Sequence, residues 1–95
     1  MNNEITEEKL NKYLKLSEKA LNIVKKKIIS GMEKNAKEII EMVSNYLLDA
    51  RHFKSKKDFV NAFAAVNYAH GWLDAGARLG FWDIDKEVRD YFVVD

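Results

Sequence analysis

The sequence contains no cysteine and no proline, and each absence removes a class of structure. Without cysteine the chain can form neither a disulfide bond nor a thiolate nucleophile, and such a composition is typical of the reducing cytoplasm. Without proline, the strongest helix breaker is missing. Glycine occurs only four times, at positions 31, 71, 76 and 80. We therefore expect a cytoplasmic protein built from long helices.

An excess of charge of one sign is also lacking. Sixteen Lys and Arg residues balance 15 Asp and Glu residues, which leaves a formal net charge of +1. This balance gives no general attraction to nucleic acid or to an anionic membrane. No apolar run approaches the roughly 18 residues that a membrane span needs, so we expect no membrane association. With 47% hydrophobic and 33% charged residues, the sequence predicts one globular domain over residues 1–95.

The least polar long segment, residues 57–80, is predicted to be the central helix of a bundle. Its apolar residues recur at steps of three and four, which places them on one helix face. A second apolar face carries Tyr68, Trp72, Ala75 and Leu79. A helix with two apolar faces should be covered on both sides. Gly71 and Gly76 each cost this helix about 1 kcal/mol relative to Ala, which indicates close packing or close approach of a ligand there.

Two further helices are predicted, over residues of about 7–29 and 33–54. Thr6 suits the N-cap of the first helix, and Gly80 suits the position just after the third. The first helix has a narrow, mostly apolar stripe of Leu10, Leu14, Ser17, Leu21, Val24 and Ile28. Short connections make consecutive helices antiparallel. The predicted fold is an all-α, antiparallel up-down-up three-helix bundle, with residues 81–95 as a short C-terminal extension packed on it.

Three local features refine this prediction. Ser55 and Asp58 resemble a capping box that starts the central helix. The extension is too apolar for a free tail, so we expect a turn and a short helical segment near 85–91, although its end could instead bind a partner. The basic clusters Lys25–Lys27 and Arg51–Lys57 should lie at opposite ends of the bundle. Phosphate binding needs cations that converge, so nucleic acid is an unlikely partner.

One constellation on the central helix could carry chemistry. The polar stripe, at steps of three and four, consists of Asn67, His70, Asp74 and Arg78. A carboxylate beside an imidazole can orient a general base or support a metal ligand. A hydrogen-bonded structural network is the favoured interpretation, because the chain has only two histidines and this segment has no nucleophile. We expect no catalytic residue, no metal and no cofactor.

Three aromatic residues, Tyr68, Trp72 and Trp82, are predicted anchors of a core or an interface. Tyr68 and Trp72 are less suited to base stacking, because stacking platforms usually lie in a cationic groove.

The segment Asp58–Ile84 resembles the signature of a known family. This segment, DFVNAFAAVNYAHGWLDAGARLGFWDI, is similar to domain-of-unknown-function family 357. The similarity is strongest over NAFAAVNYAHGWLDAG and RLGFWD, and the resemblance covers about residues 36–84. The resemblance implies an archaeal, cytoplasmic three-helix bundle and no particular activity. Family members often have glycine where this chain has Lys57. The family's motif positions correspond to Asn67, Tyr68, His70, Trp72, Asp74, Gly76, Arg78, Leu79 and Gly80.

The residues together favour a non-enzymatic protein-interaction or scaffold module, whose partner is another protein or a second copy of the chain. The alternative is a small-ligand- or nucleotide-binding helical domain that uses the polar stripe around Gly71. A third hypothesis, RNA binding through the lysine clusters, requires steeply salt-dependent binding.

Overall fold

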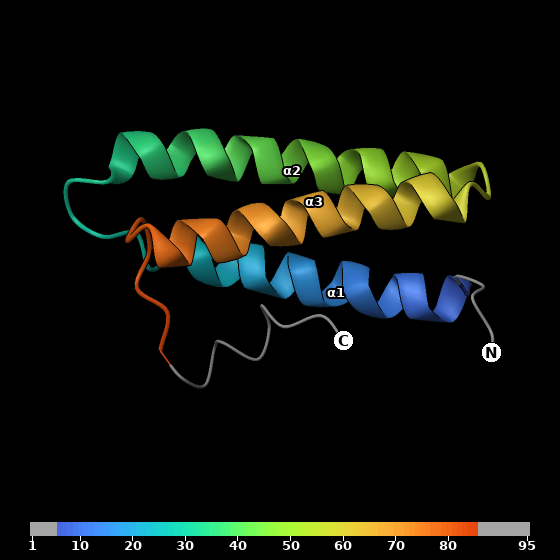
Figure 1. Cartoon of the computed structure of the whole chain (residues 1–95), viewed down its shortest axis with the longest axis horizontal. Coiled ribbons are helices and arrows are strands. Elements are labelled where there is room, and N and C mark those ends of the chain that lie inside the picture. The colour runs from blue at the N-terminus through green and yellow to red at the C-terminus, as the bar shows by residue number, and fades with distance from the viewer. Residues whose placement is uncertain (1–5, 86–95) are drawn as a thin grey trace.

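The computed structural model describes residues 6–85 and folds them into three helices. These are α1 (Glu7–Val24), α2 (Glu33–Ser55) and α3 (Phe59–Arg78). They run up, down and up, and α3 lies between the other two (Figure 1). The packing is most extensive between α2 and α3, and least extensive between α1 and α2. The predicted all-α, antiparallel three-helix bundle with a central third helix is confirmed.

The starts of α1 and α3 follow from side-chain caps, whereas α2 begins after Met32 without one. Thr6 Oγ1 accepts a hydrogen bond from the backbone N–H of Lys9 at 3.1 Å, as predicted for the N-cap of α1. Asp58 alone caps α3, where its Oδ1 accepts from the backbone N–H of Asn61 at 3.3 Å. The predicted capping box with Ser55 is wrong, because Ser55 is still the last residue of α2 and its Oγ donates to the His52 carbonyl.

The turn between α2 and α3 forces one lysine into a left-handed conformation. The N–H groups of Lys57 and Asp58 donate to the carbonyls of Lys54 and Phe53, each at 2.9 Å. This pair of bonds is a Schellman motif, which requires a left-handed residue and usually has glycine there. Lys57 occupies that position with φ 61°.

The first helix ends at Val24, five residues before the predicted end at about 29. Ile28 instead pairs with Trp82 in an isolated antiparallel bridge. The N–H of Ile29 donates to the Phe81 carbonyl at 3.0 Å, and the N–H of Asp83 donates to the Lys27 carbonyl at 2.8 Å. Ile28 is still partly buried against the core. Because it follows the buried Val24 by four residues, the sequence pattern resembles one more turn of the first helix.

A second Schellman turn ends α3 and returns the chain to the bundle. Gly80 has φ 81°, and the N–H of Phe81 donates to the Gly76 carbonyl at 2.9 Å. The predicted role of Gly80 just after the helix therefore agrees with the structure. Residues 81–84 fold back onto the bundle, and Trp82 is buried in its core. The expected helical segment near 85–91 lies almost entirely outside the described residues.

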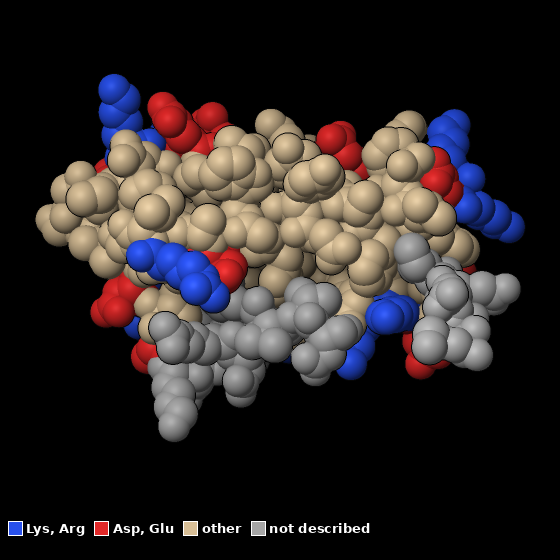
Figure 2. Space-filling view, in the orientation of Figure 1, with Lys and Arg blue, Asp and Glu red and all other residues tan. Residues whose placement is uncertain are grey.

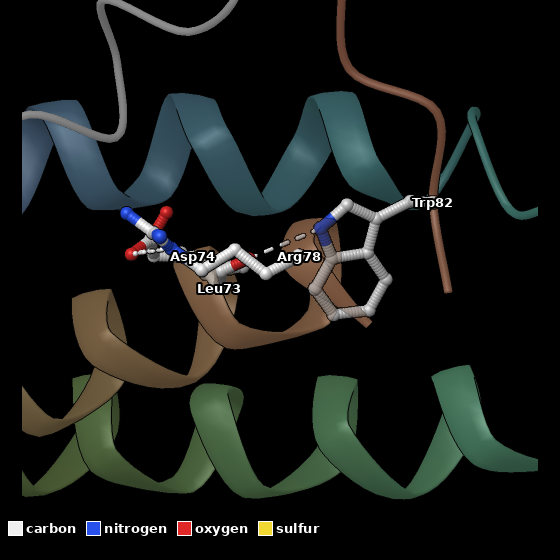
Figure 3. A network of polar contacts seen from close by, with 4 residues as sticks. All are labelled: Leu73, Asp74, Arg78 and Trp82. Carbon is white, nitrogen blue, oxygen red and sulfur yellow. Dashed lines mark hydrogen bonds and ion pairs between the residues drawn. The ribbon is translucent and has the colours of Figure 1, made fainter. Parts of the chain in front are cut away.

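The Trp82 ring packs into the core at the end of the bundle where α1 and α3 terminate. Its Nε1–H donates to the Leu73 carbonyl at 3.1 Å (Figure 3). The ring lies directly on Gly76, where an added Cβ would be 2.0 Å from the nearest ring carbon. The close packing predicted at Gly76 is thus packing against Trp82. Gly71 differs, because an added Cβ there would have no neighbour within 4 Å.

The two glycines of α3 should respond oppositely to alanine. Gly76→Ala drives a methyl group into the Trp82 ring, and we expect it to lower the free energy of unfolding by about 2–3 kcal/mol. Gly71→Ala meets open space and should raise it by up to about 1 kcal/mol, since Ala favours the helix. Urea denaturation of dilute protein measures both, and a Gly76→Ala protein as stable as wild type would contradict the packing described.

The strained turn offers a second test. Lys57→Gly removes the left-handed strain, and we expect a stability gain of up to about 1 kcal/mol, reduced by the entropy that glycine adds to the unfolded chain. The matched control is Lys56→Gly, where φ is −90° and glycine relieves nothing, so stability should fall. Thermal unfolding compares the two variants. Equal effects at both positions would show that the turn imposes no strain on Lys57.

Candidate functional site

The predicted polar stripe of α3 is divided between the inside and the outside of the bundle. His70 is buried, and its Nδ1 shares a hydrogen bond of 2.9 Å with the Oγ of Ser17, which is fully buried in α1. Which group donates depends on which ring nitrogen carries the proton. Asn67, by contrast, is exposed. The buried member of the stripe therefore joins α3 to α1.

Asp74 and Arg78 form the outer part of the stripe. The Nε–H of Arg78 donates to Asp74 Oδ2 at 2.9 Å (Figure 3). The Arg78 side chain is exposed and that of Asp74 is half-exposed. An exposed ion pair one helical turn apart contributes only about 0.3–0.5 kcal/mol to stability. The structure thus brings Asp74 together with Arg78, and His70 together with Ser17.

Ser17 is the partner that sequence reasoning missed. The helical spacing puts Ser17 in the mostly apolar stripe of the first helix and predicts no polar role for it. One signal in the sequence could have revealed it: Ser17 is the only hydroxyl residue in a stripe with Leu10, Leu14, Leu21 and Val24. A hydroxyl buried among such residues needs a hydrogen-bond partner, which must come from another helix.

The predicted aromatic anchors divide in the same way. Trp82 is buried in the core, whereas Tyr68 is exposed and Trp72 is partly so. Tyr68 stacks on Tyr46 of α2, with ring centroids 5.5 Å apart and planes inclined by 21°. The second apolar face of α3 was predicted to be covered. That prediction is wrong for the described chain, because α1 and α2 cover only the inner sides of α3 and leave Tyr68 open to solvent.

This exposed face is the most unusual surface of α3. The outer face of α3 is defined by Val60, Ala64, Tyr68, Gly71, Trp72, Ala75 and Leu79. Val60, Tyr68 and Leu79 are 69%, 62% and 65% exposed. From position 59 to position 73 the helix has no Asp, Glu, Lys or Arg. Figure 2 shows the resulting wide area over α2 and α3 with few charged side chains. A helix face exposed to water normally carries charges, so this face has the composition of an interface.

The charged residues gather elsewhere. Lys25–Lys27 follow the end of α1 and Arg51–Lys57 span the end of α2, at opposite ends of the bundle (Figure 1). The predicted separation of the two basic clusters is confirmed. Arg51 is paired with Glu18 across the hollow between α1 and α2. The two clusters are therefore too far apart to contribute to one phosphate site together.

The described part of the chain contains neither a cluster of metal ligands nor a helix suited to cross a membrane. Within residues 6–85, no three His, Asp or Glu side chains are placed so that they could share a metal ion. None of α1, α2 and α3 has the length and apolar character that a membrane crossing demands.

Comparison with known proteins gives one similarity. A family model described as protein of unknown function (DUF357) matches residues 12–82, which include all of α2 and α3 and most of α1. The matched range contains Ser17, His70, Gly76 and Trp82. No curated protein and no solved structure matches the chain.

The division of the polar stripe into a buried part and an exposed part leads to a prediction about stability. We expect His70→Ala to lower the free energy of unfolding by about 2–4 kcal/mol, because it opens a cavity and removes the partner of Ser17. Asp74→Ala is the control and should change stability by no more than about 0.5 kcal/mol. A cycle that adds Ser17→Ala should give a coupling of about 0.5–3 kcal/mol with His70. Urea denaturation measures the wild type, the three single variants and the Ser17/His70 double variant. An Asp74→Ala loss as large as that of His70→Ala would contradict the inside–outside division.

Proposed function

Because the chain belongs to the DUF357 family, whose description names no activity, its role has to be sought on its own surface, and we propose a helical protein-interaction module that binds through the outer face of α3. The observation that carries this proposal is the exposed, uncharged face itself. The stretch without charged residues, 59–73, covers about four turns of the helix. Tyr and Trp are enriched in interfaces and often supply most of the binding energy, and Tyr68 and Trp72 both belong to this face.

Gly71 supports the same proposal. A glycine in a helix interior costs about 1 kcal/mol relative to Ala. No contact within the described chain requires it, because a Cβ at this position would meet nothing within 4 Å. A glycine on an exposed face allows another backbone or side chain to approach the helix closely. The position is therefore explained by a partner that lies outside the chain.

The same geometry gives less support to an enzyme or to a small-ligand site at the polar stripe. Such a site needs Asn67, His70, Asp74 and Arg78 to face one space. The hydrogen bonds divide them, with His70 directed to α1 and Asp74 held by Arg78 at the surface. The interaction module is accordingly the function we favour.

A photocrosslinking experiment tests the module. A photoreactive amino acid replaces Leu79 on the outer face, and in a control protein it replaces Lys37, which is exposed on α2. In cells that naturally make the protein, we expect covalent adducts from position 79 and few from position 37. Adding Ala64→Glu should reduce the adducts at least about tenfold, because a charge would have to be buried at the interface.

Mass spectrometry identifies each adduct. An adduct of the chain with any protein that depends on Ala64 supports the outer face as the binding surface. Equal labelling from positions 79 and 37, or labelling that Ala64→Glu leaves unchanged, would contradict the proposal.

A further inference from the structure

We propose that the partner of the outer face is a second copy of the same chain, whose α3 packs antiparallel on the first α3. This inference rests on the proposed function and adds the identity of the partner. It follows from the order of residues along the face, which is nearly symmetrical about the point between Ala69 and His70. A twofold axis at that point would place most residues of the face opposite a residue of suitable size and charge in the second copy, while Trp72 would lie level with Asn67.

The central four positions have the spacing of a coiled-coil seam. Ala64, Tyr68, Gly71 and Ala75 are separated by steps of four, three and four residues, the alternation that a heptad seam has. In an antiparallel pair about this centre, Ala64 of one copy lies level with Ala75 of the other. Tyr68 lies level with the second copy's Gly71. The seam therefore has four layers, two of Ala with Ala and two of Tyr with Gly.

The sizes of these side chains are complementary. Layers of Ala and Gly let two helix axes approach to about 8 Å, the short end of the usual range. The bulky Tyr68 then needs a space in the facing helix, and Gly71 leaves that space open, since nothing lies within 4 Å of its Cβ position. Stacking on Tyr46 supports the Tyr68 ring from its own chain. One pairing thus explains both the exposed tyrosine and the unexplained glycine.

The two ends of the face match as well. Val60 of one copy lies level with the second copy's Leu79, and both are more than 60% exposed in the single chain. Arg78 lies level with the second copy's Asn61, whose side-chain amide donates to the carboxylate of Asp58 at 2.7 Å. The guanidinium of one copy is thereby brought near a carboxylate of the other, at both ends of the pair. Opposite charges at the rim help to fix the direction of packing.

A parallel pair lacks these matches. Each residue would then face its own equivalent, so the two Tyr68 rings would compete for one layer while the two Gly71 positions faced each other across an empty one. The two Arg78 side chains would also lie together, and like charges in contact oppose association. The antiparallel arrangement is the one that the face favours.

The absence of cysteine from the sequence allows a clean test by disulfide trapping. We would make Ala64→Cys and Ala75→Cys as separate proteins, with Lys37→Cys as the control on another face. In the antiparallel pair, positions 64 and 75 of different copies are level, whereas two copies of position 64 are about 16 Å apart along the axis. A disulfide needs Cα atoms within about 7 Å, so only the mixture of the two variants should cross-link efficiently.

The expected result is a covalent dimer of twice the 11.0 kDa chain mass from the mixture. Its yield should exceed that of either variant alone, or of either mixed with Lys37→Cys, by at least about tenfold, since distant positions fall outside disulfide range. A homodisulfide of Ala64→Cys alone at comparable yield would overturn the antiparallel arrangement. Yields equal to the Lys37→Cys control would overturn pairing through this face.

Sedimentation equilibrium of the unmodified chain gives an independent readout. A single helix pair is a small interface, so we expect a Kd on the order of 10–100 μM. Gly71→Leu fills the space for the second copy's Tyr68 and should weaken association at least about tenfold, with unchanged helical circular dichroism. A wild-type chain that stays monomeric at about 0.5 mM would overturn the second copy as partner. The proposed function would survive that result if position 79 still cross-linked to a different protein.

Discussion

The contact between Trp82 and Gly76 is the constraint on which the rest of the structure depends. The ring can lie on α3 only because Gly76 has no side chain, and its N–H finds a partner in the Leu73 carbonyl. With the ring fixed, residues 81–83 pair with the segment that follows α1. One aromatic side chain thereby joins the end of α3 to the end of α1, the two helices that also share the His70–Ser17 hydrogen bond.

The inner and outer faces of α3 differ in what they contribute to the fold. The inner face holds the small buried residues that pack on α1 and α2, together with His70 and Gly76, on which the Trp82 ring packs. The outer face contributes little to that core, yet it carries exposed aromatic and aliphatic side chains with no charge over most of its length. Because this surface contributes little to the fold and is poorly suited to water, we propose that it associates with another protein.

The sequence predicted α2 and the central place of α3 well, because helical period is a local property. The end of α1 was missed because Ile28 pairs with Trp82, a contact far away in the sequence. The helical period correctly places His70 and Asp74 on the same side of α3. That side lies at the edge of the buried face, so the period alone cannot say which of the two is buried. The contact with Ser17 of α1 shows that it is His70. Apolar spacing also cannot distinguish a face covered by the same chain from one covered by another.

The central claim is that one face of α3 holds the bundle while the other binds a second copy. Amide and side-chain NMR spectra of the labelled chain, recorded from dilute to near-millimolar protein, test it directly. The account predicts concentration-dependent shifts at Ala64, Tyr68, Gly71 and Ala75, and constant positions for the Trp82 indole and the Leu73 amide. Shifts centred on α1, or spectra that do not change with concentration, would contradict it.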